Sequence, residues 1–534
     1  GELVDKCTRG SSSSNHYTSP SSKWFNPGSS SGSGSYAGSG GKPIVIYTYS
    51  LDKDNNATIT SYKGNAYSLN IPKTLDGYTV TAIGESAFSG NKRIHSVNFP
   101  DTVTSIGKEA FYNCTNLSSV ILPDNLTYLG ANSFGQCDSL TEIHIPKSLE
   151  KVGTDKGYTY TYGPFSFSGL QKVTFEEETT SVLNNLFRYA EKLKDVELPS
   201  SITSIGENAF LSCEALEYIT IPENVTNIYE AAFNNCKALK EITIPSQVSV
   251  IRDHTFIDCT SLAKVTLPQT LTSIAGQAFY NCDALAEVDL PDELTNLEAY
   301  AFYDCDALTN LVIPDKLKTI SGSTFENCDV LKTVQFGAAV QTIEGEAFCN
   351  CDALTSVEIG NKIKTIGTKS FYDCDALETV KLGNSVTKID SQAFAHCDVL
   401  KNVSLGFGLT KIGGQAFYEC AVLEEIVIPY YVSQVDSGAF VNCPKLAKVV
   451  THPNLTNISN TAFSYPDVTV FYGTADSYTQ TWANDNGYRF EVNTVAASEA
   501  TVPETIDMVT GETQILDLSV TPADFADAIS YKSS

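Results

Sequence analysis

The sequence repeats itself between residues 279–301, FYNCDALAEVDLPDELTNLEAYA, and residues 302–324, FYDCDALTNLVIPDKLKTISGST. The phenylalanine that opens this unit recurs every 23 residues from Phe187 to Phe463. An earlier run of the same residue comprises Phe88, Phe111 and Phe134. A fixed period of this length is typical of repeat proteins, in which one unit cannot bury its apolar side alone but a stack of units can. The sequence therefore predicts one long solenoid rather than separate globules.

Each unit contains one clear strand signal. In the copy that starts at Phe233, apolar and polar residues alternate toward the end of Leu239–Ile244. Pro245 then stops the strand, because proline cannot donate to a ladder. We expect the segment from Asp253 to Cys259 to form a short helical turn. Stacking adds one strand per coil to a parallel sheet, with roughly 4.8 Å between strands, and the Phe, Cys, Leu and Ile side chains form columns in the interior.

The recurring pattern L-x-x-V-x-I-P-x-x-V-T-x-I-G-x-x-A-F-x-x-C resembles the BspA-type leucine-rich repeat of bacterial surface proteins. Leu216–Phe233 and Leu377–Phe394 are good copies, although Gly383 stands where the pattern has proline. The resemblance covers residues 67–472. It implies an α/β repeat fold, a right-handed leucine-rich-repeat solenoid of about 16–17 coils with a concave parallel β-sheet. It also implies extracellular-matrix binding in some relatives.

Segments outside the regular repeats have their own signatures. Residues 1–42 are dominated by serine and glycine, a composition typical of a flexible tail or linker. Residues 43–66 are rich in strand formers, and we expect them to form a hairpin that caps the first coil, because an open solenoid end exposes its core. Residues 473–492 resemble the C-terminal cap of the family, with a short helix around Ser477–Asn484.

Residues 493–534 lack the repeat and resemble the first strands of a bacterial immunoglobulin-like domain of group 2. About 40 residues are too few for that sandwich, which needs roughly twice as many. We therefore expect a truncated start of such a domain, and a chain that is a fragment of a longer multidomain surface protein.

The register breaks between Phe134 and Phe187, which lie two repeats and seven residues apart. The surplus falls in an irregular insertion at residues 153–164, and insertions in a repeat map to surface loops, often on a binding face. Three tyrosines alternate within it: Tyr158, Tyr160 and Tyr162. The row favours either an aromatic contact site or a hairpin that packs this face on its own coil.

Fifteen cysteines would suggest disulfides, but their positions argue for buried thiols. Thirteen of them occupy one inward column of the repeat. Parallel inward side chains keep their Cβ atoms near the strand spacing, beyond the ~3.8 Å that a disulfide prefers. Cys349, two residues before its column position, and Cys7, in the tail, are the two candidates for exposed thiol chemistry.

Composition excludes several classes of function. A formal net charge of −27 argues against binding nucleic acid or anionic membrane surfaces. No apolar run approaches the ~20 residues of a membrane-spanning helix, so no direct membrane insertion is expected. The sequence has no H-E-x-x-H motif, no glycine-rich phosphate loop and no C-x-x-C metal pair. We therefore expect no enzyme activity and no cofactor.

An acidic residue follows the column cysteine on six consecutive coils: Asp283, Asp306, Asp329, Asp352, Asp375 and Asp398. One interpretation is that each carboxylate accepts backbone hydrogen bonds within its own turn. The other is a row of calcium sites, which would need further carbonyl or carboxylate ligands. One carboxylate per coil favours the first interpretation, and the calcium alternative stays open.

The outward positions of the predicted strands present a polar, net acidic surface without a deep apolar cluster. Its partner-binding candidates, beside the three tyrosines of the insertion, are Glu142, His144, Asp195, Glu197, Tyr218, Glu241, Glu287 and Asp289. Such a sheet suits a protein or glycan better than a small substrate. We expect a monomeric bacterial recognition or adhesion module, secreted or at the cell surface, that binds a host or microbial surface protein or glycan. The alternative is a structural spacer or targeting arm of a larger multidomain extracellular enzyme.

Overall fold

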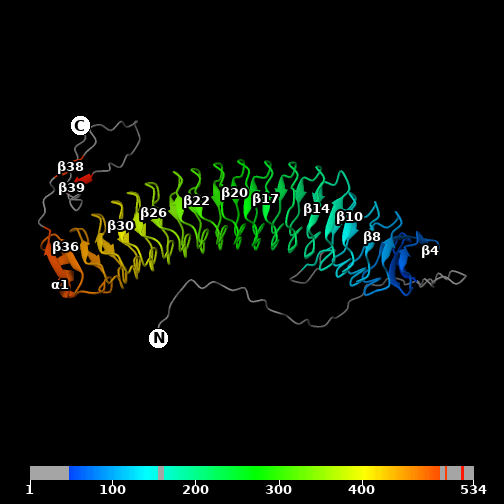
Figure 1. Cartoon of the computed structure of the whole chain (residues 1–534), viewed down its shortest axis with the longest axis horizontal. Coiled ribbons are helices and arrows are strands. Elements are labelled where there is room, and N and C mark those ends of the chain that lie inside the picture. Colours follow the sequence, from blue (N-terminus) through cyan, green and yellow to red (C-terminus); the bar gives the residue numbers. More distant parts are fainter. Residues whose placement is uncertain (1–46, 154–160, 494–498, 502–518, 522–534) are drawn as a thin grey trace. The chain divides into compact units, whose positions relative to one another are not determined.

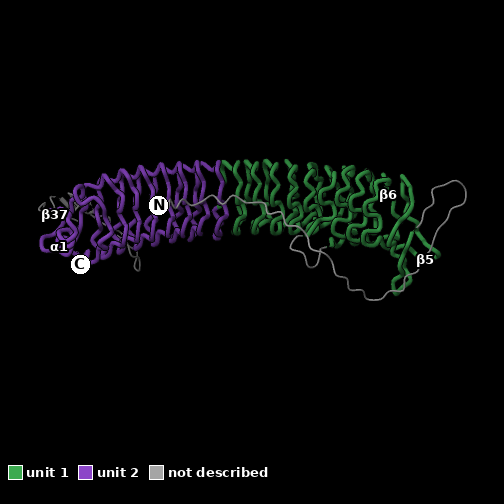
Figure 2. The backbone as a smooth tube through the Cα atoms, turned by 90° about the horizontal axis from the view of Figure 1, so that it is seen from below, with its two compact units in different colours: residues 1–291 green, residues 292–534 purple. Residues whose placement is uncertain are grey.

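The computed structural model describes residues 47–153, 161–493, 499–501 and 519–521. Two compact units make up the chain, Gly1–Pro291 (unit 1) and Asp292–Ser534 (unit 2), which Figure 2 colours separately. Each is a parallel β-solenoid whose regular coils repeat every 23 residues, and the described residues contain a single short helix (Figure 1). The predicted solenoid is confirmed.

Unit 1 carries two rows of parallel strands, of which the first is the predicted one. Successive strands pair in register, for example Glu241 with Lys264, and the middle residue of each is buried between exposed neighbours. The first row consists of β3 (Ser68–Asn70), β6 (Ser96–Asn98), β8 (Ser119–Ile121), β10 (Glu142–Ile145), β12 (Lys172–Phe175), β14 (Asp195–Glu197), β17 (Glu241–Thr243) and β19 (Lys264–Thr266).

The second row was not predicted, and its strands have only two residues each. The second residue of each strand is a buried aliphatic side chain, such as Ile205 or Ile251. This row consists of β7 (Ser105–Ile106), β9 (Tyr128–Leu129), β11 (Lys151–Val152), β13 (Ser181–Val182), β15 (Ser204–Ile205), β16 (Asn227–Ile228), β18 (Val250–Ile251) and β20 (Ser273–Ile274).

Residues 47–83 cover the start of unit 1. β1 (Tyr47–Leu51) and β2 (Ala57–Tyr62) form an antiparallel hairpin, and β2 runs parallel to β5 (Tyr78–Ile83), which also pairs with β4 (Thr74–Leu75). The rings of Tyr47 and Tyr62 lie 6.5 and 5.2 Å from the ring of Phe88. The hairpin therefore shields that end of the core.

Unit 2 repeats the two rows with little variation. Its first row consists of β22 (Asn310–Val312), β24 (Thr333–Gln335), β26 (Ser356–Glu358), β28 (Thr379–Lys381), β30 (Asn402–Ser404), β32 (Glu425–Val427), β34 (Lys448–Val450), β36 (Val470–Gly473) and β37 (Arg489–Val492). Its second row consists of β21 (Asn296–Leu297), β23 (Thr319–Ile320), β25 (Thr342–Ile343), β27 (Thr365–Ile366), β29 (Lys388–Ile389), β31 (Lys411–Ile412), β33 (Gln434–Val435) and β35 (Asn457–Ile458).

The segment around each phenylalanine is a series of turns, and the predicted helical turn is wrong. His254 and Asp258 both adopt a left-handed backbone with φ 59°, which a right-handed helix does not contain. Alternate N–H groups donate to the next coil instead, as from Phe256 to the Ala278 oxygen at 2.8 Å. This conformation also explains the frequent asparagine or aspartate two residues after the phenylalanine, because both tolerate left-handed angles.

A column of buried phenylalanine rings fills each unit. Phe233 and Phe256 stack in unit 1 with centroids 5.6 Å apart and planes 4° from parallel. Phe371 and Phe394 do the same in unit 2, at 5.3 Å and 2°. Stacking of this kind stabilises the core by more than area burial alone.

The cysteine column lies beside the rings and bonds to their backbone. The Cys236 thiol donates to the Phe210 oxygen at 3.2 Å, and the same contact recurs along the column. All described cysteines are buried free thiols. Cys349 is among them, so its candidacy for exposed thiol chemistry is wrong, while Cys7 lies outside the described residues. Burial raises the pKa of the Cys114 thiol to about 11, which suppresses the reactive thiolate.

The C-terminal end of the unit 2 core is covered by α1 (Tyr478–Asp485) and β37. The Ser477 side chain caps the helix by accepting from the Gln480 N–H at 3.2 Å. The Trp482 ring then lies 6.0 Å from Phe463, the last ring of the column. Beyond this cap, β38 (Glu499–Thr501) pairs antiparallel with β39 (Ser519–Thr521).

Candidate functional site

The outward side chains of the first strand row of unit 1 form a surface that we call the strand face. All eight of its partner-binding candidates are exposed: Glu142, His144, Asp195, Glu197, Tyr218, Glu241, Glu287 and Asp289. The coil register brings side chains into columns, in which Lys264 pairs with Glu241 on one side and with Glu287 on the other. The structure therefore gathers the predicted residues on one surface.

Lys172 also lies on this surface, although the sequence did not point to it. Its strand pairs it with Glu142 on one side and Asp195 on the other. The Lys172 ammonium group lies 3.2 Å from the Asp195 carboxylate and also contacts Glu197. Hydrogen bonds to Glu197 and Asp195 raise the pKa of Lys172. This part of the strand face thus alternates positive and negative charge.

Thr174, on the same strand as Lys172, was not predicted from the sequence either. Its hydroxyl lies 2.9 Å from Nδ1 of His144, so the histidine ring is held against the neighbouring coil. The register break hid this coil from the periodicity. The available signal was the segment Leu170–Phe175, which fits the L-x-x-V-x-I pattern with phenylalanine in the last place.

Three hollows indent the strand face. One of about 230 Å³ lies beside Glu142 and Lys172. A second of about 320 Å³ lies beside Tyr218 and Lys264, and a third of about 340 Å³ lies beside Lys264 and Glu287. One of these volumes lies below the usual range of small-ligand sites, about 300–1,000 Å³, and the other two lie at its lower end. The hollows therefore suit side chains or sugar units of a larger partner.

Tyr218 is the exposed aromatic residue among these hollows. It is 53% exposed, and the ammonium group of Lys240 lies 5.3 Å from its ring centre. Glu217 holds that lysine through a 2.6 Å hydrogen bond, which lowers the pKa of Glu217. One side of the ring is therefore covered by a cation, which a tyrosine ring attracts, while much of the ring remains exposed.

The insertion is only partly described. Tyr158 and Tyr160 lie outside the described residues. Tyr162 is half-buried, with its ring 6.0 Å from Phe167 and 5.9 Å from Tyr189. For this tyrosine the geometry favours packing against its own solenoid, the second of the two interpretations.

Phe165 keeps the core continuous through the insertion. It lies 31 residues after Phe134 and 22 before Phe187, and its ring stacks 5.8 and 5.9 Å from theirs. The first strand row is also continuous here, because β12 pairs with both β10 and β14. The long coil therefore changes neither the core column nor the strand face.

The second strand row is interrupted at the same place. Among the described residues, β11 pairs only with β9, and β13 pairs only with β15. The row is also interrupted between β16 and β18, where the coil has its regular length. In a regular coil the Gly206 N–H donates to the Val182 oxygen at 2.8 Å. Among the described residues, the equivalent N–H of Leu183 has no hydrogen-bond partner. Among the described residues, the insertion thus leaves one edge of β11 and one edge of β13 unpaired.

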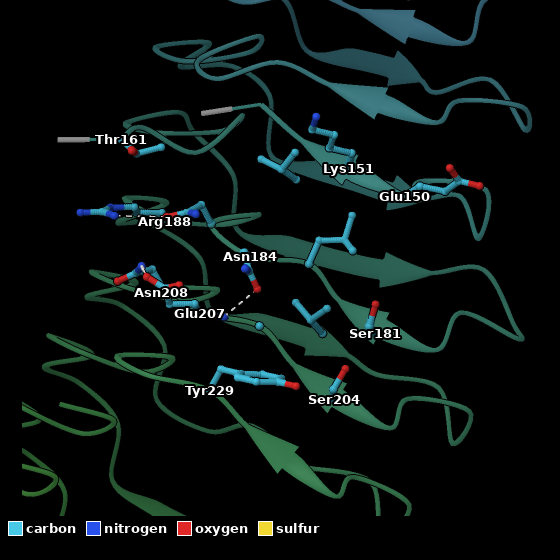
Figure 3. Close-up of a pocket in the computed structure, with 15 residues that line it drawn as sticks. Glu150, Lys151, Thr161, Ser181, Asn184, Arg188, Ser204, Glu207, Asn208 and Tyr229 are labelled. Atoms are coloured by element: carbon cyan, nitrogen blue, oxygen red, sulfur yellow. Dashed lines mark hydrogen bonds between the residues drawn. The ribbon is translucent and has the colours of Figure 1, made fainter. Parts of the chain in front are cut away.

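A pocket of about 600 Å³ lies over this interruption, and we call it the coil-break pocket. In Figure 3, Lys151, Ser181 and Ser204 line it from three successive strands of the second row. Its lining residues are Glu150, Lys151, Val152, Thr161, Ser181, Val182, Leu183, Asn184, Asn185, Arg188, Ser204, Gly206, Glu207, Asn208 and Tyr229. No sequence motif points to this pocket, because it arises from a missing strand pairing.

Hydrogen bonds hold several pocket side chains in place. The Asn184 side-chain oxygen accepts from the Glu207 N–H at 2.9 Å, a bond drawn as a dashed line in Figure 3. The Asn208 amide donates to the Glu207 carboxylate at 3.0 Å. The Arg188 guanidinium donates to Asn185 at 3.2 Å. The polar wall is therefore ordered without any ligand.

The aspartate row does not form a recognisable metal site. Its six members are half-buried or exposed. Within the described ranges, no three His, Cys, Asp or Glu side chains are grouped as metal ligands would be. Burial raises the pKa of Asp398, and the neighbouring Asp375 raises it further, as expected for repelling rungs. The calcium alternative stays a prediction for these residues.

Within the described part of the chain, no helix has the length and apolar character that crossing a membrane requires. Glu326 is buried in unit 2, and its burial raises the pKa of the carboxyl to about 7. It lies among repeat residues and was not singled out from the sequence.

Comparison with solved structures finds leucine-rich repeat proteins. A protein from Bacteroides ovatus is 24% identical with a TM-score of 0.53, and the match covers 84% of this chain and 98% of that one. A leucine-rich cell surface protein from Faecalibacterium prausnitzii is 24% identical with a TM-score of 0.32, covering 83% and 97%. The pneumococcal vaccine antigen PcpA is 16% identical with a TM-score of 0.36, covering 85% and 99%. The first likeness shows the fold.

A search of curated protein sequences found no match. The profile of the BspA type leucine-rich repeat region matches residues 60–156, 161–268, 227–355 and 341–469, which is most of the chain. The same segments contain the stacked phenylalanine column and both strand rows. The chain therefore belongs to the BspA-type leucine-rich repeat family.

Proposed function

We propose that this chain is a non-catalytic recognition or adhesion module of a bacterium, secreted or displayed at the cell surface. Its partner is a protein or glycan on a host or microbial surface. It binds that partner through the strand face and the insertion at residues 153–164.

One observation carries this proposal: within the described residues, the strand face is an ordered array of exposed side chains. Every coil contributes two outward residues at a fixed spacing, and the core behind them is complete without any partner. Lysines alternate with carboxylates around Lys172 and Lys264. Patterned charge of this kind gives specificity toward a complementary macromolecular surface.

The proposed location rests on the family and on composition. The repeat resembles that of bacterial surface proteins, and the strongly acidic chain is unsuited to nucleic acid. We also propose that residues 493–534 begin an immunoglobulin-like domain, as their resemblance implies.

The alternative is a spacer or targeting arm of a larger extracellular enzyme. A spacer needs only the stacked core, so the identity of the outward residues would not matter. The two functions therefore differ in what a strand-face substitution does.

The test measures binding of the chain to surfaces coated with extracellular-matrix glycoproteins, with mucin or with whole bacterial cells. The strand-face variant combines Tyr218→Ala, Glu241→Lys and Glu287→Lys. The control combines Tyr431→Ala, Glu358→Lys and Glu425→Lys, which changes an exposed tyrosine and two exposed glutamates of unit 2. We expect only the first variant to lose binding to the surface that the unchanged chain recognises.

Shortening the insertion by residues 154–161 is the second arm. The deletion leaves Gly163 in place. A residue with a Cβ at this position would come within 2.5 Å of the Asn185 oxygen. We expect weaker binding with unchanged thermal stability. Unchanged binding in the strand-face variant, or no binding to any of the coated surfaces, would contradict the recognition function and favour the spacer.

A further inference from the structure

We infer that the coil-break pocket binds a neutral saccharide of about disaccharide size. The pocket lies at the second strand row, away from the strand face, and the inference does not depend on the function proposed above. It rests on the lining chemistry, the charge balance, the aromatic wall and the volume.

The lining is rich in groups that both donate and accept hydrogen bonds. Three amides and three hydroxyls line the pocket: Asn184, Asn185, Asn208, Thr161, Ser181 and Ser204. A saccharide hydroxyl likewise donates one hydrogen bond and accepts others, so it is matched by side chains with both capacities. Two of the amides are already oriented by hydrogen bonds to Glu207, which reduces the ordering that binding would require.

The formal charges of the lining residues balance. Lys151 and Arg188 are positive, while Glu150 and Glu207 are negative. A phosphate or carboxylate ligand would meet no excess of positive charge here, in a chain whose formal net charge is −27. The balance therefore favours a neutral ligand over an anionic one.

Tyr229 supplies an aromatic wall. It is 40% exposed, and the Arg252 guanidinium lies 5.1 Å from its ring centre. In the preceding coil its position is taken by Gly206, which also lines the pocket and has no side chain to fill it. The C–H face of a sugar ring packs well against such a partly exposed aromatic ring with polar groups around it.

The pocket volume of about 600 Å³ lies within the usual range of small-ligand sites, about 300–1,000 Å³. It is nearly twice the volume of the strand-face hollow beside Lys264 and Glu287, about 340 Å³. The two unpaired strand edges border this space and add backbone donors and acceptors. Size and polarity together point to a short saccharide rather than an apolar molecule.

The experiment is saturation-transfer NMR on the full chain with three neutral probes, namely lactose, cellobiose and N,N′-diacetylchitobiose. We expect transfer to at least one of them, with a dissociation constant of roughly 1 mM. Tyr229→Ala and Asn208→Ala should each weaken it by about tenfold. The second substitution suits the left-handed backbone of Asn208, because Ala231 adopts the same conformation one coil later.

Tyr300→Ala is the matched control, since Tyr300 is 39% exposed and lies in unit 2 outside the pocket. It should leave saccharide binding unchanged, and thermal melting checks that each variant folds. The inference is overturned if none of the three probes shows transfer at tens of millimolar. It is also overturned if both pocket variants bind as the unchanged chain does, or if glucuronate binds while the neutral probes do not.

Discussion

The regular coils of unit 2 and the coils around the insertion in unit 1 retain different features of the repeat. In unit 2 the second strand row runs from β23 to β35 without interruption. In unit 1 it stops at β11, resumes at β13 and breaks again between β16 and β18, and Ser168 and Ala190 stand where the repeat has cysteine. Phe165 nevertheless continues the ring column, and β12 continues the first strand row. A coil can therefore lose its cysteine and its second ladder, whereas the ring and the first strand are retained.

The sharpest way to break this comparison is to remove a ring from each region. Phe165→Ala and Phe371→Ala should each lower the free energy of unfolding by about 3–5 kcal/mol, because both rings are fully buried between neighbours. Urea unfolding of the full chain, followed by circular dichroism, measures both. A much smaller loss for Phe165→Ala would show that the insertion coil does not depend on its ring.

The exception in unit 2 is a buried carboxyl with a raised pKa, not an interrupted strand row. Burial raises the pKa of Glu326 to about 7, Glu346 adds to the rise, and a hydrogen bond with Ser323 opposes it. Because the folded pKa exceeds the ordinary value of 4.5, the folded chain binds more protons between these values. Stability therefore falls as pH rises through this window.

Glu326→Gln should remove that fall. The unfolding free energy of the variant minus that of the unchanged chain should rise by about 2 kcal/mol from pH 5 to pH 8. Urea titrations at several pH values measure the difference. A difference that does not change with pH would mean that the carboxyl titrates alike in the folded and unfolded chains.

Replacing a cysteine of the column should lower the free energy of unfolding only slightly. The Cys374 thiol donates to the Phe348 oxygen at 3.3 Å, so Cys374→Ala should cost about 1 kcal/mol and still fold, as the natural Ala190 suggests. Urea unfolding gives the loss, and mass spectrometry of the unreduced chain checks for disulfides. A bridge between successive column cysteines would contradict the account of the column as buried thiols.

Much of the fold follows from the period of the sequence. The spacing of the phenylalanines predicts the coil length, and the alternation in Leu239–Ile244 predicts the first strand row. The second row could not be found this way, because a two-residue strand such as Ser204–Ile205 is too short to show alternation. The turns around Phe256 depend on left-handed residues bonded to the next coil, which local propensity does not reveal.

Of the candidate sites, the strand face could largely be predicted from the sequence and the coil-break pocket could not. The outward residues of the strand face follow from strand alternation, so Glu241 and Glu287 could be named from the sequence. Lys172 was missed because its coil follows the register break. The coil-break pocket could not be predicted, because its walls meet only where β11 and β13 fail to pair.

The most direct test of this account is hydrogen exchange at two equivalent backbone amides. The Gly206 N–H donates to the preceding coil, and the equivalent Leu183 N–H at the interruption has no partner among the described residues. In the full chain we predict that the Leu183 amide exchanges at least about 100-fold faster than the Gly206 amide. Equal protection of the two amides would contradict it, because the second ladder would then continue through the insertion and the coil-break pocket would lose its origin.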